Sequence, residues 1–100
     1  MILHITSPDM WEAAQRSGTY EPPSLAEEGF IHFSAPEQLA GVVERYYRDS
    51  SGLVVLHVEP DAVGDLRYEE SHGESFPHLY GPLQAAAVTR VTPLEEQLGG

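Results

Sequence analysis

The sequence contains no cysteine among its 100 residues. This absence excludes a disulfide framework, a thiolate zinc site and a cysteine nucleophile, and it is compatible with a reducing cytoplasm. There is also no run of eighteen apolar residues, and no basic N-terminal region followed by a long apolar stretch. We therefore expect a soluble cytoplasmic protein that has no targeting segment and no membrane partner.

Positive charge is scarce as well. Five arginines and no lysine stand against sixteen acidic residues, which gives a formal net charge of -11. Because nucleic-acid binding depends on cations that displace phosphate counterions, this balance argues against a long DNA or RNA partner. A small-molecule or nucleotide ligand remains compatible, provided that an arginine or a helix N-terminus points toward it.

The length and the order of the sequence patterns predict a single α+β domain over residues 1–100. Apolar runs and alternation predict a mostly antiparallel, split sheet of roughly five or six strands, with two main helices. The expected strands lie at about 2–6, 28–34, 53–59, 66–70 and 84–91, and the expected helices at about 8–17 and 35–48. The remaining segments are an expected loop over 71–75, an irregular connection over 76–83 and a loose acidic tail over about 93–100.

Capping signals mark the starts of both helices. Ser7 is the expected N-cap of the first, Pro8 takes its first position, and Gly18 ends it. Ser34 is the expected N-cap of the second, with Glu37 reaching back in a capping box. Ser34 therefore has two candidate roles, as a helix cap or as a ligand contact. The residues expected to be buried are Met10, Trp11, Ala14, Leu39, Val42, Val43 and Tyr46, and Gly41 is expected to approach a strand closely.

The stretch 28–34 carries a histidine in the middle of an otherwise apolar strand. Alternation places Phe30, His32 and Ser34 on one, mixed face of that strand and Ile31 and Phe33 on the other, apolar face. The first strand repeats the pattern, because His4 and Thr6 also share one face. Two strands that each present a histidine and a hydroxyl on one face predict a polar cleft between them.

Short motifs extend along nearly the whole chain. They include Leu3-His4-Ile5-Thr6, Glu28-Gly29-Phe30-Ile31-His32, Arg67-Tyr68-Glu69 and Phe76-Pro77-His78-Leu79-Tyr80-Gly81-Pro82-Leu83. Through these motifs the sequence resembles the bacterial domain-of-unknown-function 952 family. The fold of that family resembles the ADP-ribosyltransferase superfamily, which includes the NAD-dependent RNA 2'-phosphotransferases. The resemblance thus implies an ADP-ribosyltransferase-like fold and an activity that uses NAD as substrate.

The same resemblance implies which residues would act on NAD. His4, followed by Thr6, stands in the first strand where a polar residue would contact the ribose. His32, followed by Ser34, corresponds to the second polar position. The residues that the resemblance implies to be catalytic are His4, His32, Glu69 and His78.

Two assignments within this set remain open. Either Glu69 or His78 would complete the site by fixing a ribose hydroxyl or the acceptor. Tyr20 would cap the ligand, or it is a half-buried loop tyrosine. The residues expected to bind the cofactor are Thr6, Ser34, Tyr20 and Tyr80.

Three functions remain open from the sequence. The first is NAD-dependent transfer of ADP-ribose to a small molecule or a protein, or hydrolysis of NAD; the short, acidic chain argues against an RNA acceptor. The second is a non-catalytic module that binds a nucleotide or another small ligand. The third is metal-dependent hydrolysis, but no HxH or HxxxH spacing supports it and no metal ligand is assigned. Without a GxGxxG loop, a pyrophosphate would meet an arginine, the helix N-termini at Pro8 or Pro36, or backbone amides.

Overall fold

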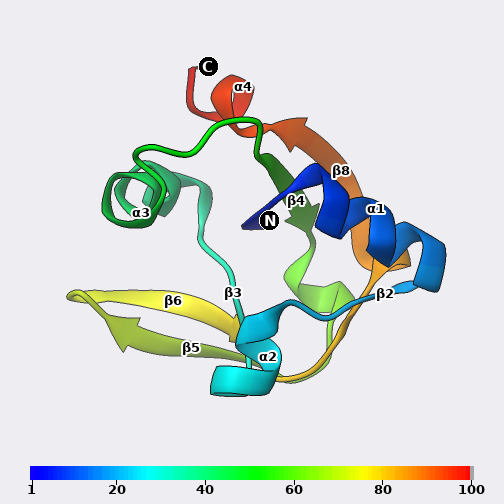
Figure 1. Ribbon diagram of the computed structural model, residues 1–100. Helices are drawn as coiled ribbons and strands as arrows, with labels where there is room; N and C mark the ends of the chain where they lie inside the picture. The colour runs from blue at the N-terminus through cyan, green and yellow to red at the C-terminus, as the bar shows by residue number, and fades with distance from the viewer. Residues whose placement is uncertain (100) are drawn as a thin grey trace.

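The computed structural model describes residues 1–99 and has the expected α+β architecture (Figure 1). The described residues form four α-helices, which are α1 (Pro8–Ser17), α2 (Pro23–Glu28), α3 (Leu39–Tyr46) and α4 (Leu94–Gly99). They also form eight strands, which are β1 (Ile2–Thr6), β2 (Thr19–Tyr20), β3 (Ile31–His32), β4 (Val54–Val58), β5 (Leu66–Ser71), β6 (Glu74–Leu79), β7 (Leu83–Gln84) and β8 (Val88–Pro93). Single 3-10 turns lie at Pro36–Gln38, Pro60–Ala62 and Ala85–Ala87.

The strands form three small sheets, and every pairing in them is antiparallel. The sheet orders are β1-β4-β8, β3-β6-β5 and β2-β7. An isolated bridge between Leu3 and Ser34, with both backbone hydrogen bonds at 2.8 Å, joins the two three-stranded sheets. The predicted split antiparallel sheet is therefore present, although it is divided into eight short strands instead of five or six.

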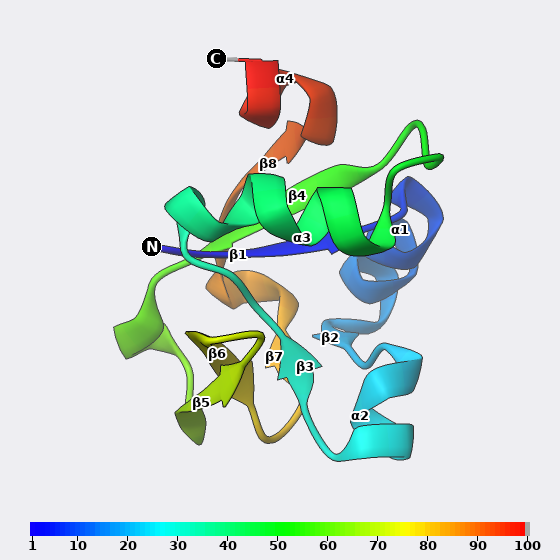
Figure 2. The ribbon, with the colours of Figure 1, turned by 90° about the vertical axis from the view of Figure 1, so that its left-hand side faces the viewer.

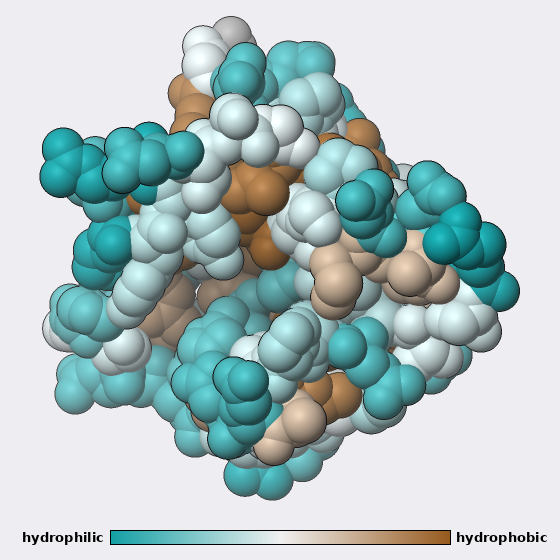
Figure 3. Space-filling model, in the orientation of Figure 1, coloured by the Kyte–Doolittle hydropathy of each residue, from teal (hydrophilic) through white to brown (hydrophobic). Residues whose placement is uncertain are grey.

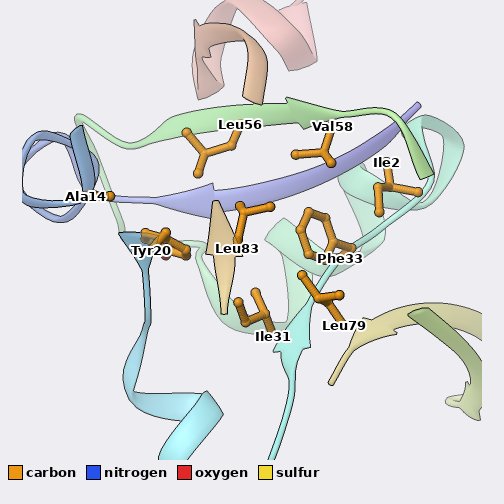
Figure 4. Close-up of a cluster of buried hydrophobic side chains, with 9 residues drawn as sticks. All are labelled: Ile2, Ala14, Tyr20, Ile31, Phe33, Leu56, Val58, Leu79 and Leu83. Atoms are coloured by element: carbon orange, nitrogen blue, oxygen red, sulfur yellow. The ribbon is translucent and has the colours of Figure 1, made fainter. Parts of the chain in front are cut away.

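The hydrophobic core lies on both faces of the β1-β4-β8 sheet. On one face, Ile2, Leu56 and Val58 point toward Phe33 and Leu83 (Figure 4). On the other face, α3 crosses over β1 and β4, and α4 lies nearby (Figure 2). The buried residues of that second cluster are Leu3, Ile5, Leu39, Val55 and Leu94. β4 is thus covered on both sides, as its continuous apolar run predicted.

The predicted alternation in the histidine-bearing stretch is confirmed. Ile31 and Phe33 are buried in the core, at 0% and 2% exposure, whereas His32 between them is exposed. Because burying the two apolar side chains fixes which way the strand faces, the histidine is forced outward. The core thereby orients this part of the candidate site.

The segment 76–83 is mainly a paired strand, not the irregular connection expected from its two prolines. β6 is the middle strand of its sheet, where proline is normally disfavoured because it has no amide hydrogen. Pro77 is accommodated because the sheet uses only its carbonyl, which accepts a hydrogen bond from the Phe33 amide at 3.0 Å. The expected loop at 71–75 is the end of the β5–β6 hairpin.

The C-terminal part of the chain also differs from the expectation. The single strand predicted at 84–91 is divided, because a 3-10 turn at Ala85–Ala87 separates β7 from β8. The tail predicted to be loose folds as α4 through residue 99; Leu94 is buried, and its amide donates to the Leu53 carbonyl at 2.9 Å. Gly100, the last residue of that predicted tail, lies outside the described residues.

α1 has the predicted limits. The Ser7 hydroxyl accepts a hydrogen bond from the Met10 amide at 3.2 Å, and Gly18 ends the helix with a φ of 90°. Its buried stripe is narrower than expected, because Ala14 is buried and Trp11 packs against the core, but Met10 is exposed. α1 therefore contacts the core mainly through its middle turn.

The second main helix, α3, is shorter than the predicted 35–48, because a 3-10 turn occupies Pro36–Gln38 and α3 itself runs from Leu39 to Tyr46. The side chain of Gln38, not that of Glu37, reaches back and accepts a hydrogen bond from the Ala35 amide at 2.9 Å. The N-cap position of the 3-10 turn is therefore Ala35, and Ser34 precedes it as a residue whose backbone pairs with Leu3. Ser34 thus does not take the helix-cap role that the sequence allowed.

Two further expectations for this helix are wrong. Tyr46 is 62% exposed, and it is Tyr47 that packs against the core cluster. The only atom within 4 Å of a Cβ placed at Gly41 belongs to the Arg45 side chain, so no strand approaches this glycine closely. Leu39 is buried, and Val42 and Val43 pack against the core as predicted.

Candidate functional site

A cleft of about 910 Å³ is lined by residues of β1, the start of α1, β3, α3 and the β5–β6 hairpin. The space-filling view shows a recess between the surface formed by α3 and that formed by the hairpin (Figure 3). The predicted site residues that line the cleft are His4, Thr6, Tyr20, His32, Ser34 and His78. Glu69 and Tyr80 lie beside the cleft and reach it through contacts with its lining residues.

His4 is buried and both of its ring nitrogens have protein partners. Nδ1 donates to the backbone carbonyl of His32 at 2.6 Å, and Nε2 lies 2.6 Å from the Tyr20 hydroxyl. Burial lowers the pKa of His4 to about 4, so the ring is neutral at pH 7. A neutral ring that donates through Nδ1 accepts at Nε2, and Tyr20 therefore donates its proton to His4.

Tyr20 extends this chain of hydrogen bonds to a hydroxyl at the cleft. Its phenol oxygen lies 2.8 Å from Thr6 Oγ1, and burial raises the pKa of Tyr20 to about 12. If His4 takes up a proton, Nε2 becomes a donor and Tyr20 turns its own proton toward Thr6. Tyr20 is 2% exposed in β2 and lines the cleft, so it is not a half-buried loop residue.

A second group forms at the hairpin, where the same carboxylate oxygen serves two donors. Glu69 Oε1 lies 2.7 Å from His78 Nδ1 and accepts from the Tyr80 hydroxyl at 2.6 Å. These bonds, first that from Tyr80 and then that from His78, lower the pKa of Glu69, while the carboxylate raises the pKa of Tyr80. Glu69 and His78, which the sequence offered as alternatives, are therefore partners.

Aromatic rings surround His78. Phe30 stacks on its imidazole with centroids 4.1 Å apart and planes at 18°, and the ring of His32 lies 5.3 Å away. The guanidinium of Arg67 lies over the ring of Tyr80, with the guanidinium carbon 4.0 Å from the ring centroid. Packing on several sides holds these rings in place, which preorganises the histidine–carboxylate pair.

The charges of the cleft are few and are contributed by Glu28, Arg45 and Glu70. Glu28 Oε2 lies 2.8 Å from His32 Nε2. Within residues 1–99, no carboxylate lies within 4.0 Å of the Arg45 guanidinium, which sits 5.9 Å from the centroid of the Phe76 ring. Arg45 is the only arginine on the described cleft wall, and nothing in the sequence patterns had singled it out.

Three observations concern other kinds of site in the described residues. Among residues 1–99, no group of three or more histidine, cysteine, aspartate or glutamate residues has the arrangement of a metal site. None of the helices described here is long and apolar enough to cross a membrane. A smaller hollow of about 400 Å³ between α1 and α2 has no histidine or arginine in its wall.

Comparison with known proteins identifies the family. The family model described as "Protein of unknown function (DUF952)" matches residues 5–91, which is most of the chain. The chain belongs to the DUF952 family. This match confirms the family resemblance drawn from the sequence motifs.

Solved structures similar to this DUF952 chain belong to protein CC0527 from Caulobacter crescentus. Its crystal structure matches with a TM-score of 0.84 and 39% identity, covering 92% of this chain and 83% of that chain. Its solution NMR structure matches with a TM-score of 0.78 and 40% identity, covering 92% and 82%. A comparison with curated proteins finds no match. The α+β fold is therefore shared with CC0527.

Proposed function

We propose that the cleft binds NAD as substrate and that this protein transfers ADP-ribose to a small-molecule or protein acceptor, or to water. The main support is that polar side chains from β1, β3 and β6 converge on one cleft, among them a histidine hydrogen-bonded to a carboxylate. The volume of about 910 Å³ falls within the range of about 300–1,000 Å³ typical of small-molecule sites. The split antiparallel sheet agrees with the ADP-ribosyltransferase-like fold that the motifs imply.

His78 is the proposed general base. Because its Nδ1 donates to Glu69, Nε2 keeps the lone pair that can accept a proton. As a hydroxyl of the acceptor, or water, attacks the ribose carbon, the new C–O bond forms and the C–N bond to nicotinamide breaks. The hydroxyl proton moves to Nε2, and nicotinamide leaves as a neutral base with the electron pair of the broken bond. The carboxylate of Glu69 stabilises the imidazolium that results.

His4 is proposed as a positioning residue. Both of its nitrogens are bonded within the protein, so it has none left for a substrate. Its bond to the His32 carbonyl instead fixes the backbone of β3 against β1. The groups left to meet the ribose hydroxyls are those of Thr6, Ser34 and His32, which line the cleft.

The charges of the cleft disfavour an anionic acceptor. Glu28 and Glu70 line it, and the whole chain carries a formal charge of -11. An acceptor that brings a carboxylate, or an RNA with its phosphates, would be repelled. A neutral hydroxyl is also the kind of nucleophile that gains most from a general base.

Chromatography of nicotinamide released from NAD tests this function. We expect His78→Gln to lower the release by about 100-fold, since general-base catalysis contributes roughly 10²–10⁴-fold. His57→Gln is the matched control, because His57 is also buried but bonds to Thr92 away from the cleft. Circular dichroism checks that both variants fold. Release that is equal in the wild type and in His78→Gln would contradict the proposal.

A non-catalytic binding module is the second candidate. It is favoured by the engagement of both His4 nitrogens, which leaves the cleft with fewer reactive groups than the motifs implied. This candidate predicts that NAD raises the unfolding temperature without any release of nicotinamide. No thermal shift at millimolar NAD or any other nucleotide would count against both candidates as nucleotide-binding proteins.

A further inference from the structure

The cleft has a second end, formed where α3 faces the turn of the β5–β6 hairpin. Four side chains from these elements line it, and we call them the aromatic mouth: Arg45, Tyr46, His72 and Phe76. The rings of Tyr46 and His72 lie 6.2 Å apart with planes at 78°, and Arg45 lies over Phe76. Figure 1 shows α3 and the end of the hairpin facing each other across the gap. None of these contacts involves the histidine–carboxylate pair.

The fold alone does not account for two of these residues. Tyr46 is 62% exposed, and its neighbour Tyr47 provides the packing against the core. His72 is the one non-glycine residue among residues 1–99 with a positive φ, at 53°. Left-handed backbone costs an ordinary residue about 1–2 kcal/mol, and glycine or asparagine would fit this turn better. The two-residue turn between Ser71 and Glu74 requires this positive φ but does not require a histidine, and the side chain of His72 lines the cleft.

The chemistry of the mouth suits a planar base carrying phosphate. Exposed aromatic rings offer stacking surfaces to a nucleobase. Arg45 is the only arginine on the described wall of the cleft. No carboxylate of residues 1–99 lies within 4.0 Å of its guanidinium. Arg16, Arg48 and Arg67, in contrast, each pair with a neighbouring carboxylate.

The spacing along β6 indicates a ligand with two ends. Phe76 and His78 both line the cleft from this strand, which runs on to Glu74 beside the hairpin turn. The four steps along the strand from His78 to Glu74 extend over about 13 Å. A base and its own ribose are directly bonded, so a mononucleotide that reacts near His78 would not reach the mouth with its base. A dinucleotide would reach both.

We propose that the aromatic mouth holds the adenine base of NAD against Tyr46 and His72, with Arg45 on the pyrophosphate. This assignment rests on the proposed function, because it places the second half of the same substrate. The assignment predicts that the aromatic mouth determines the affinity for NAD and does not affect the rate of the chemical step.

Calorimetry with AMP and adenosine, together with the kinetics of nicotinamide release, tests the assignment. We expect Tyr46→Ala to raise the Kd for AMP and the KM for NAD about tenfold, in line with the stacking of one base, and to leave kcat unchanged. Tyr68→Ala is the matched control, because Tyr68 is 58% exposed and lies outside the cleft. Arg45→Gln should weaken the binding of AMP, which carries a phosphate, and leave the binding of adenosine unaffected.

His72→Asn separates a ligand role from a turn role. Asparagine tolerates a positive φ, so the variant should be at least as stable as the wild type while its KM for NAD rises about threefold. If NAD is cleaved and neither Tyr46→Ala nor His72→Asn changes its KM, the assignment is overturned and the proposed function stands. If AMP binds at the mouth but nicotinamide is never released, the assignment stands and the catalytic proposal falls. If neither AMP nor NAD binds the wild-type protein, both fall.

Discussion

His4 and His78 are buried to the same extent, each with 8% exposure, but they have different partners. His4 lies between a carbonyl and a phenol, neither of which carries a charge. His78 lies against the carboxylate of Glu69. Exposure therefore does not decide what a histidine does; the partner of each nitrogen does. A carboxylate stabilises an imidazolium and leaves a base on the other side of the ring, whereas the two neutral partners of His4 hold its ring in place and burial keeps that ring neutral.

The residues hydrogen-bonded around His4 and those around His78 also lie in different surroundings. The chain from His4 through Tyr20 to Thr6 joins β1 to β2 and, through the His32 carbonyl, to β3. Its loss should affect the whole domain. Glu69, His78 and Tyr80 lie on or directly after one hairpin, and Glu69 is open to solvent on its outer side. The loss of their hydrogen bonds should therefore affect the reaction more than the stability of the fold.

Truncation of His4, compared with that of His78, is expected to give the largest loss of stability. His4→Ala should lower the free energy of unfolding by about 4 kcal/mol, because it leaves two buried polar partners unpaired and opens a cavity. His78→Ala should cost about half as much, since only one hydrogen bond is lost. Urea denaturation at pH 7 measures both. Equal losses would mean that the two rings contribute alike to the fold.

Acidification is expected to give the next largest effect, through His4. Its pKa is about 4 in the folded state and near 6.5 when unfolded, so the unfolded chain binds a proton that the folded chain does not. Stability is then fully present above pH 6.5 and falls as the pH drops toward 4, by about 3 kcal/mol. Urea denaturation across this range should show a flatter profile for His4→Gln than for the wild type. Parallel profiles would show that His4 does not cause the loss.

The two tyrosines are expected to give the smallest difference. Tyr20→Phe should lower the free energy of unfolding by about 1 kcal/mol, because a buried hydrogen bond to His4 is lost. Tyr80→Phe should cost less than that, and it should instead raise the pKa of Glu69 toward its ordinary value, since the Tyr80 hydroxyl is the main cause of its depression. Thermal unfolding measures the first effect, and an NMR titration of the Glu69 carboxyl measures the second. An unchanged carboxyl pKa would remove Tyr80 from the set.

Several features of the fold were readable from local signals. Ser7, Pro8 and Gly18 set the limits of α1, because caps act within one turn. The outward position of His32 followed from the apolar residues on either side of it. The strand at 76–79 was missed because its prolines argue against a sheet interior, and only the pairing with Phe33 reveals that the missing amide is not needed.

The sequence by itself determined the family, the α+β class and the presence of histidines and hydroxyls on the same faces of two strands, because these depend on motifs and on the alternation of side chains. Only the tertiary structure decided which of those groups are already occupied. It paired His78 with Glu69, enclosed His4 between Tyr20 and the His32 carbonyl, and brought Arg45 of α3 to the cleft. The contacts of His4 join residues distant in the chain, and the contact of His78 with Glu69 joins two strands of a hairpin. Their placement with Arg45 at one cleft follows from the packing of three sheets and a helix, which no local pattern encodes.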